Sequence, residues 1–256
     1  MPTSALLLLL LSCCTSAEAS SSTPWTRLFN KVAQSPTASG VGFAAGLVVG
    51  STLLNPSTFE VYYTASDVPS AYIREHKSLS ADVISVADGD TIRVRHRPLP
   101  LVAGGPQKIK GKLKDETISV RLMAVDAPEV GKFGRSSQPF ADVARGFVKE
   151  SVLGKRIRVR CWDRDQYGRL VGEVRYGLFG RKELSPELVR EGLAVVYTGK
   201  DASYGERSVG EWKALQMRAQ AERRGMWVDG VEGVQLPSEY KRAARQAKST
   251  PSTTAR

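Results

Sequence analysis

The stretch TISVRLMAVDAPE occupies residues 117–129, and it decides which class of fold this chain adopts. Its first part, 117–125, alternates apolar and polar side chains, which is typical of a β-strand that buries one face. The strand carries Arg121, and Asp126 and Glu129 follow it directly. The stretch therefore predicts a strand that ends at a pair of carboxylates.

Four other runs of the chain show the same alternation, with an apolar residue at every second position. They are ADVISVA (81–87), TIRVRHR (91–97), KRIRVRCW (155–162) and RLVGEVRY (169–176). Short strands of this number suit a small, strongly twisted barrel.

Helices are predicted between and after these strands. The segment 137–154 places its apolar side chains at helical spacing, between the third strand and the fourth. Two further helices are expected over 185–196, with Ser185 as N-cap, and around 205–224. Because this order is that of an OB-type barrel, we expect an α+β domain, mainly a five-stranded OB-fold barrel with about three helices.

Two short motifs flank the opening stretch, DGDT at 88–91 and DQYGR at 165–169. Together with 121–129 they bring carboxylates and arginines to strand ends and turns, the groups that hold a divalent metal ion and cleave a phosphodiester. Each motif alone has an ordinary structural explanation, since Asp-Gly is a common turn signal and strand ends often carry solvated charges. Their conjunction favours a catalytic site.

The motifs, taken together, resemble the staphylococcal nuclease (thermonuclease-like) family in order and in local spacing. The matching segments are DGDT, RLMAVDAPE, DQYGR and LVREGLAVVY (188–197), and the resemblance runs from about Ser80 to Trp227. The wider layout, with VPSAYIREHKSL (68–79) and a long insertion at 98–116, is similar to the fungal membrane-anchored probable endonucleases of that family. The resemblance implies a nuclease on an OB-fold.

The resemblance implies a calcium site built from oxygen ligands. Asp90 and Asp126 are the expected carboxylate ligands, and the family adds a backbone carbonyl at the position of Ala127. Calcium takes several oxygen ligands, which carboxylates from different strand ends supply. Magnesium or manganese would satisfy similar donors.

The resemblance also implies catalytic and nucleotide-binding roles. Glu129 would activate the attacking water, and Arg121 and Arg169 would bind the scissile phosphate and stabilise the charge of the transition state. Tyr167 and Tyr197 match aromatic residues that contact the nucleotide base, and stacking of this kind tolerates many sequences.

Composition and charge limit the choice of function. The chain has 256 residues, and the low-complexity stretches at both ends leave roughly 150 for one core. The net charge of +11 favours a nucleic acid or an anionic membrane surface as partner, although a basic surface can also be uninvolved. Cys161 is alone in the expected domain, and His76 and His96 are the only histidines. A zinc enzyme or a Ser-His-Asp hydrolase is therefore disfavoured.

The first 36 residues are read as a targeting segment. Residues 1–36 contain six consecutive leucines, Leu6–Leu11, and then a Ser/Thr-rich stretch. The first 26 residues contain no Lys or Arg, which argues against a secretory signal and a mitochondrial presequence alike. Whether the leucine run is cleaved stays open.

Residues 37–54 form a second hydrophobic segment, long enough for a single transmembrane helix. Its flanking charges place the N-terminus inside, and a cleaved signal peptide would reverse that topology. Gly42, Gly46 and Gly50 repeat the small-residue spacing of associating membrane helices, a weak indication of self-association. The resemblance implies a mitochondrial membrane, with the secretory or ER membrane as the alternative.

The expected layout of the rest of the chain has three parts. A linker over 55–79 precedes the OB-fold domain over 80–230, and 231–256 is expected to be a basic, disordered tail. Three functions are compatible with this layout: a membrane-tethered, metal-dependent endonuclease acting on DNA or RNA with little sequence preference, a catalytically weak nucleic-acid-binding module, and a membrane-associated scaffold. Because all five catalytic and metal-binding side chains are present, the endonuclease is favoured.

Overall fold

The computed structural model describes residues 60–98, 111–131 and 136–249. The expected targeting segment and the expected membrane span, with Gly42, Gly46 and Gly50, lie outside these residues. Among the residues that are described, no helix is long and apolar enough to cross a bilayer.

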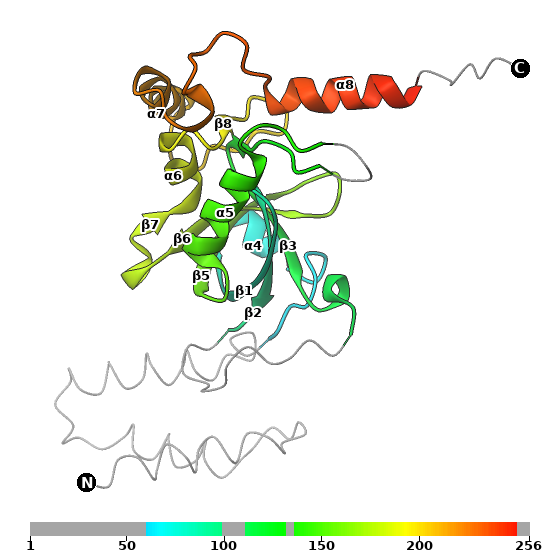
Figure 1. Cartoon of the computed structure of the whole chain (residues 1–256). Coiled ribbons are helices and arrows are strands. Elements are labelled where there is room, and N and C mark those ends of the chain that lie inside the picture. Colours follow the sequence, from blue (N-terminus) through cyan, green and yellow to red (C-terminus); the bar gives the residue numbers. More distant parts are fainter. Residues whose placement is uncertain (1–59, 99–110, 132–135, 250–256) are drawn as a thin grey trace, which may run out of the picture. The chain divides into compact units, whose positions relative to one another are not determined.

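Five strands close into a barrel, as the alternating sequence pattern predicts (Figure 1). They are β1 (Ser78–Asp88), β2 (Thr91–His96), β3 (Ile118–Leu122), β5 (Arg156–Arg164) and β6 (Leu170–Tyr176). β1, β2 and β3 form an antiparallel meander, β5 pairs with β1, and β6 pairs with β5. The parallel pairing of β3 with β6 closes the barrel, with Arg121 opposite Val171.

The core fills the barrel with the apolar residues of the alternating pattern. Ile92, Ile118, Val120 and Leu170 are fully buried. Gly172 lies where the barrel closes, and a Cβ there would come within 2.7 Å of a Val159 methyl group. The interior is thus packed to the point at which one closing position admits no side chain.

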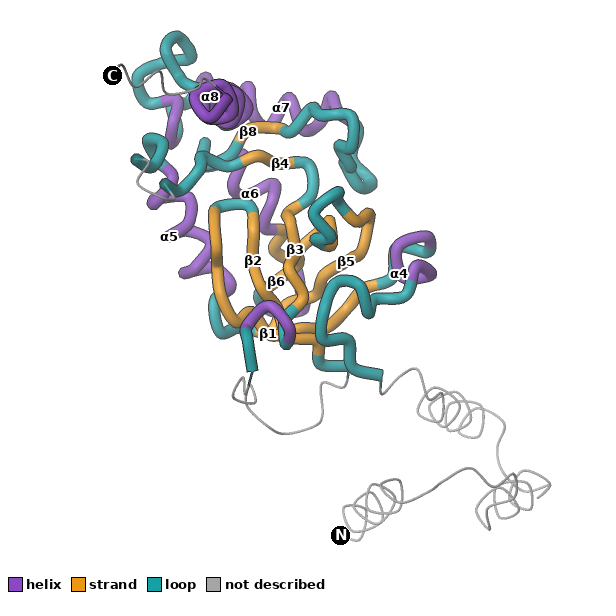
Figure 2. The backbone as a smooth tube through the Cα atoms, turned by 90° about the vertical axis from the view of Figure 1, so that its right-hand side faces the viewer, coloured by secondary structure: helices purple, strands orange, loops and turns teal. Residues whose placement is uncertain are grey.

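The third predicted strand is not continuous. It breaks after Leu122, because Ala124 adopts a left-handed conformation with φ of 64°. The chain then forms β4 (Val125–Asp126), which pairs with β8 (Val195–Val196) in a separate two-stranded ladder. Figure 2 shows this ladder at the same end of the barrel as α7 and α8. The break therefore carries Asp126 out of the barrel wall.

Five α-helices are described: α4 (Ser70–Arg74), α5 (Ala141–Val152), α6 (Leu184–Arg190), α7 (Val209–Ala221) and α8 (Pro237–Ser249). The short 3-10 turns are η2 (Leu113–Asp115), η3 (Leu178–Gly180) and η4 (Gly225–Trp227), and β7 (Lys182–Glu183) pairs with β6. The helix α5 packs against β1, and α6 packs against β6 and α7.

The helix predicted over 185–196 differs from α6 at both ends. Its N-cap is Glu183 rather than Ser185, which lies inside the helix. The helix ends at Arg190, since Gly192 takes a left-handed φ of 65° and the next residues enter β8. At its C-terminal end, tertiary pairing has thus overridden the apolar run of the sequence.

Within the segment expected to be a disordered tail, the structure places α8 over Pro237–Ser249. The first turn of this helix packs against the barrel end, where the Tyr240 hydroxyl donates a hydrogen bond to the Ser136 carbonyl at 2.7 Å. The Gln138 amide donates to the Gln235 carbonyl at 3.2 Å, just before the helix. These contacts give the segment partners that its polar composition does not indicate.

The described part of the expected linker docks on two strands, on β2 through Tyr62 and on β5 through α4 and the carbonyls of Ala65 and Val68. Tyr62 stacks on His96 with ring centroids 4.9 Å apart, and the Tyr62 N–H donates to His96 Nδ1 at 3.1 Å. His96 is buried, and this burial lowers its pKa to about 4. His96 is therefore held neutral as the acceptor for the incoming chain.

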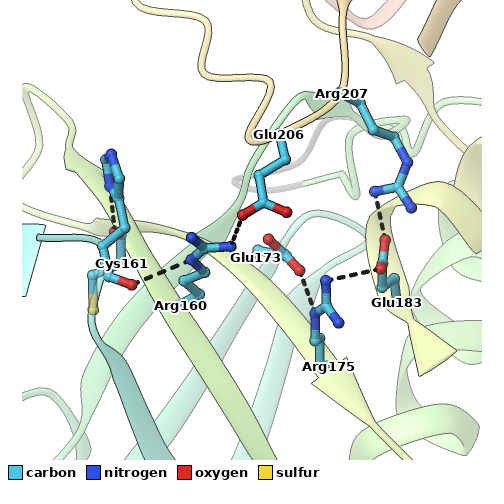
Figure 3. A network of polar contacts seen from close by, with 8 residues as sticks. Arg160, Cys161, Glu173, Arg175, Glu183, Glu206 and Arg207 are labelled. Carbon is cyan, nitrogen blue, oxygen red and sulfur yellow. Dashed lines mark hydrogen bonds and ion pairs between the residues drawn. The ribbon is translucent and has the colours of Figure 1, made fainter. Parts of the chain in front are cut away.

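A network of ion pairs fastens the loop before α7 to the strands (Figure 3). Arg160 pairs with Glu206 at 2.6 Å, and Arg207 pairs with Glu183 on β7. Arg175 on β6 pairs with Glu183 at 3.1 Å, and its guanidinium also meets the buried Glu173. The shared carboxylate of Glu183 joins the loop to the β6–β7 hairpin.

Candidate active site

The DGDT motif forms the turn between β1 and β2 and places Asp90 at the barrel end. Asp90 is only 5% exposed, and its carbonyl accepts a hydrogen bond from Leu122 N–H at 2.8 Å. A Cβ on Gly89 would stand 2.8 Å from the Ala127 methyl carbon and 3.0 Å from that of Ala144. Glycine therefore lets the turn pack directly against the residues that follow Asp126.

Asp126 lies on β4 and is 3% exposed. Burial raises its pKa because it disfavours the charged carboxylate, and the charge of Asp90 acts in the same direction. Lys241 and Arg121 oppose that rise. Asp90 and Asp126, predicted from separate motifs, are thus brought within electrostatic reach of each other.

Glu129 is held by its main chain. Its N–H donates to Gln138 Oε1 at 2.8 Å, and its carbonyl accepts from the Gln138 N–H at 3.0 Å. Gln138 is itself buried. These two hydrogen bonds fix the backbone position of Glu129 just after β4. The residues between Gly131 and Ser136 are not described.

The two predicted arginines reach the site from neighbouring strands. Arg121 on β3 is opposite Thr91, and the parallel pairing of β6 with β3 brings Arg169, which directly precedes β6, to the same end. Arg169 donates through Nε to Asp165 Oδ2 at 2.6 Å and through Nη1 to Thr91 Oγ1 at 3.1 Å. The Thr91 hydroxyl in turn donates to Asp90 Oδ1 at 2.8 Å. Thr91 therefore links a carboxylate to an arginine.

The two predicted aromatic residues lie beside the two arginines. The Arg121 guanidinium lies 4.3 Å from the ring centroid of Tyr197, and Arg169 lies 5.6 Å from that of Tyr167. Tyr167 is 69% exposed at the tip of its turn, whereas Tyr197 is partly buried and is fixed by its N–H donating to the Ala124 carbonyl. Only Tyr167 offers most of its ring to solvent.

Lys241 on α8 completes the arrangement. Its Nζ lies 2.6 Å from Asp126 Oδ1 and 2.9 Å from Glu129 Oε1. Burial opposes the positive charge, but Asp126, Asp90 and Glu129 outweigh that effect, so the pKa of Lys241 is raised. All three predicted carboxylates therefore act on one ammonium group.

The donor set fits a hard cation. Within the described ranges no three His, Cys, Asp or Glu side chains form a group that could hold a metal ion by themselves. The Lys241 ammonium between Asp126 and Glu129 nevertheless shows that these carboxylates accept a positive charge. Oxygen donors with additional carbonyl or water ligands suit calcium or magnesium rather than zinc.

Four residues of the site had no role assigned from the sequence. Thr91 and Asp165 lie inside the quoted motifs, and the Asp-x-x-Gly spacing of 165–168 is a signal for a side-chain-capped turn. Asp165 Oδ1 indeed accepts from the N–H groups of Tyr167 and Arg169, both at 2.9 Å. Gln138 has no sequence signal because it binds the backbone of Glu129, and Lys241 has none because its partner Asp126 is 115 residues away.

A closed barrel that gathers carboxylates and guanidinium groups at one end defines a phosphodiester hydrolase on an OB-type fold. The family model described as Staphylococcal nuclease homologue matches residues 119–229. The chain belongs to this nuclease family, and it is a phosphodiester hydrolase.

Individual relatives match over most of their length. Endonuclease Htp3 of Saprolegnia parasitica is 36% identical over 205 residues, which cover 78% of this chain and 94% of the relative. Probable endonuclease LCL3 of Schizophyllum commune is 35% identical over 219 residues, covering 80% and 75% respectively. The LCL3 protein of Komagataella phaffii is 35% identical over 203 residues, covering 76% and 88%. The similarity thus extends beyond the barrel.

Proposed function

We propose that this nuclease is a calcium-dependent endonuclease that cuts DNA, RNA or both with little sequence preference. The observation that carries the proposal is the chain of contacts from Asp90 through Thr91 to Arg169, beside the buried Asp126. It couples a pair of cation-binding carboxylates to a group suited to bind phosphate.

The metal ion would be held by Asp90, Asp126 and the carbonyl of Ala127. When bound, calcium supplies positive charge that draws the phosphate in and offsets the charge of the transition state. Oxygen-only donors support this assignment, and magnesium or manganese are the competing ions.

The side chains around the proposed metal ligands would activate the water and bind the phosphate. Glu129 orients the attacking water and accepts its proton at a carboxylate oxygen. Arg121 and Arg169 donate hydrogen bonds to the non-bridging phosphate oxygens, where negative charge grows in the transition state. Tyr197 and Asp165 hold these two guanidinium groups in place before substrate arrives.

Substrate contact is proposed to depend on charge and stacking. The exposed ring of Tyr167 is suited to stack on a base, and every base has a face that can stack. Tyr197, packed under Arg121, would border the same nucleotide. A net charge of +11 draws any nucleic acid to the surface. Such contacts give little selectivity among sequences.

The protein is further proposed to be tethered to a membrane by a single span over 37–54. The support is the length and apolar character of that segment. The family resemblance favours the mitochondrial membrane over the secretory or ER membrane, and the three spaced glycines support weak self-association.

The test incubates the full-length chain with single-stranded DNA, double-stranded DNA and RNA, in calcium, magnesium, manganese or chelator. We expect internal cleavage in calcium that stops in chelator. The double variant Arg121→Ala, Glu129→Ala should lack it, while Arg158→Ala, an exposed arginine on β5, should keep it. If the folded protein binds nucleic acid but cuts none of these substrates with any ion, it is a binding module instead.

A further inference from the structure

The ammonium group of Lys241 contacts Asp126, one of the two carboxylates of the proposed metal site. Its Nζ lies 2.6 Å from Asp126 Oδ1, so it forms a short charge-assisted hydrogen bond with this carboxylate. It also bridges to Glu129, the proposed water-activating carboxylate. A metal ion on Asp126 and the Lys241 ammonium would repel each other at contact distance, so we expect them to compete for this carboxylate.

The contacts that are described between α8 and the barrel end come from the N-terminal part of the helix. Tyr240 and Lys241, in its first turn, make the contacts to Ser136, Asp126 and Glu129. Pro237 is buried, whereas Arg242 and Ala243, directly after Lys241, are exposed. A helix that docks on the barrel from outside can open without unfolding the barrel itself.

We propose that α8 is an autoinhibitory plug, in which Lys241 occupies the metal site until a divalent cation displaces it. The proposal rests on the proposed metal-dependent function. Removal of the lysine charge frees both carboxylates, so metal binds more tightly. Metal binding in turn releases α8 from the barrel end. The metal concentration at which the nuclease becomes active is thus set partly by its own C-terminal helix.

The first test measures calcium binding calorimetrically on the full-length chain without nucleic acid. The variant Lys241→Met removes the charge and keeps the length of the side chain, and Lys213→Met, an exposed lysine on α7, is the matched control. We expect Lys241→Met to bind calcium about tenfold more tightly, since no closed state competes. The control should bind like the wild type. Equal affinity for all three proteins would overturn the plug.

The second test follows α8 directly by hydrogen exchange over 237–249 with and without saturating calcium. We expect slow exchange in the metal-free wild type and fast exchange after calcium is added. Lys241→Met should exchange fast in both conditions. Calcium binding that leaves the wild-type helix protected would show Lys241 to be part of the loaded site, which contradicts displacement.

These outcomes separate the plug from the proposed function. If calcium binds and Asp126→Asn abolishes the binding, the metal site stands whatever α8 does. If neither the wild type nor Lys241→Met binds calcium, magnesium or manganese, the metal-dependent function fails and the plug fails with it.

Discussion

The hydroxyl of Thr91 is the smallest part of the site and the one that connects its two halves. It donates to Asp90 and accepts from Arg169 at the same time. Because the residue is buried, water is poorly placed to substitute for either bond. A single oxygen atom thus fixes Asp90, a proposed metal ligand, relative to Arg169, which is proposed to bind the phosphate.

Replacement of Thr91 by valine keeps the shape of the side chain and removes this oxygen. We expect Thr91→Val to lower kcat by about ten- to hundredfold, because Asp90 and Arg169 each lose a buried partner. Thr91→Ser keeps the hydroxyl and should retain most of the activity. Single-turnover cleavage rates at saturating metal measure the difference, and equal rates for the two variants would show that the hydroxyl has no such role.

Asp165 allows charge and turn geometry to be tested separately. Asp165→Asn keeps an oxygen for the N–H groups of Tyr167 and Arg169 but loses the ion pair with the Arg169 guanidinium. We expect kcat to fall about tenfold with little change in stability. Asp165→Ala also loses the turn contacts and should reduce the free energy of unfolding by about 1 kcal/mol. Steady-state kinetics and urea unfolding distinguish the two variants. An Asp165→Asn variant with wild-type kcat would contradict the positioning role of the ion pair.

The docking of Tyr62 on His96 of β2 makes stability depend on pH. The pKa of His96 falls from its ordinary 6.5 to about 4 in the folded protein because the ring is buried. The unfolded state therefore binds an extra proton between these values, so the contribution of neutral His96 is complete above pH 6.5 and is lost as the pH falls toward 4. The loss amounts to about 3 kcal/mol at most.

Urea unfolding at a series of pH values, with chelator present, measures this loss. His96→Gln keeps a hydrogen-bond acceptor without the titrating ring, so its stability should change less steeply between pH 6.5 and 4. The control His76→Gln loses contacts with Cys161 and Trp162, so we expect lower stability at every pH, but its curve should keep the wild-type slope because His96 is intact. Parallel curves for wild type and His96→Gln would exclude His96 as the cause.

The strands of the barrel could be predicted because their period of two is a local property of the sequence. The break at Ala124 could not, since a left-handed alanine is imposed by the pairing of β4 with β8 rather than by its own preference. The same pairing ended α6 early. Propensity thus gave the element types, and long-range pairing moved their ends.

The residues of the candidate site likewise differ in whether the sequence could predict them. Asp90, Asp126, Arg121 and Arg169 lie in short motifs, and the structure brings them to one end of the barrel. Lys241 lies 115 residues from Asp126 in the sequence, so no motif of ordinary length could connect them. Gln138 likewise acts through the backbone of Glu129, which leaves no trace in residue spacing. The catalytic roles of the predicted residues stay predictions.

The molecule as a whole carries an excess of positive charge that should dominate binding of nucleic acid. In chelator, where no cleavage occurs, we expect duplex affinity to fall about 10- to 1000-fold between about 50 and 200 mM salt, because released counterions drive association. Arg169→Ala should reduce the slope of log affinity against log salt by about 1 if this guanidinium contacts a phosphate. Fluorescence anisotropy measures both, and salt-independent binding would contradict an electrostatic interface.

The closure of the barrel by β3 and β6 also bears on how the enzyme is made. The carboxylates come from the first three strands of the barrel and the chain just after them, but Arg169 reaches Thr91 only when β6 has joined β3 in parallel. A chain still emerging from the ribosome, or halted before Tyr176, therefore has no complete proposed site. Cleavage by the proposed nuclease should therefore appear only once synthesis has passed the last strand of the barrel, so an unfinished copy would release no active enzyme.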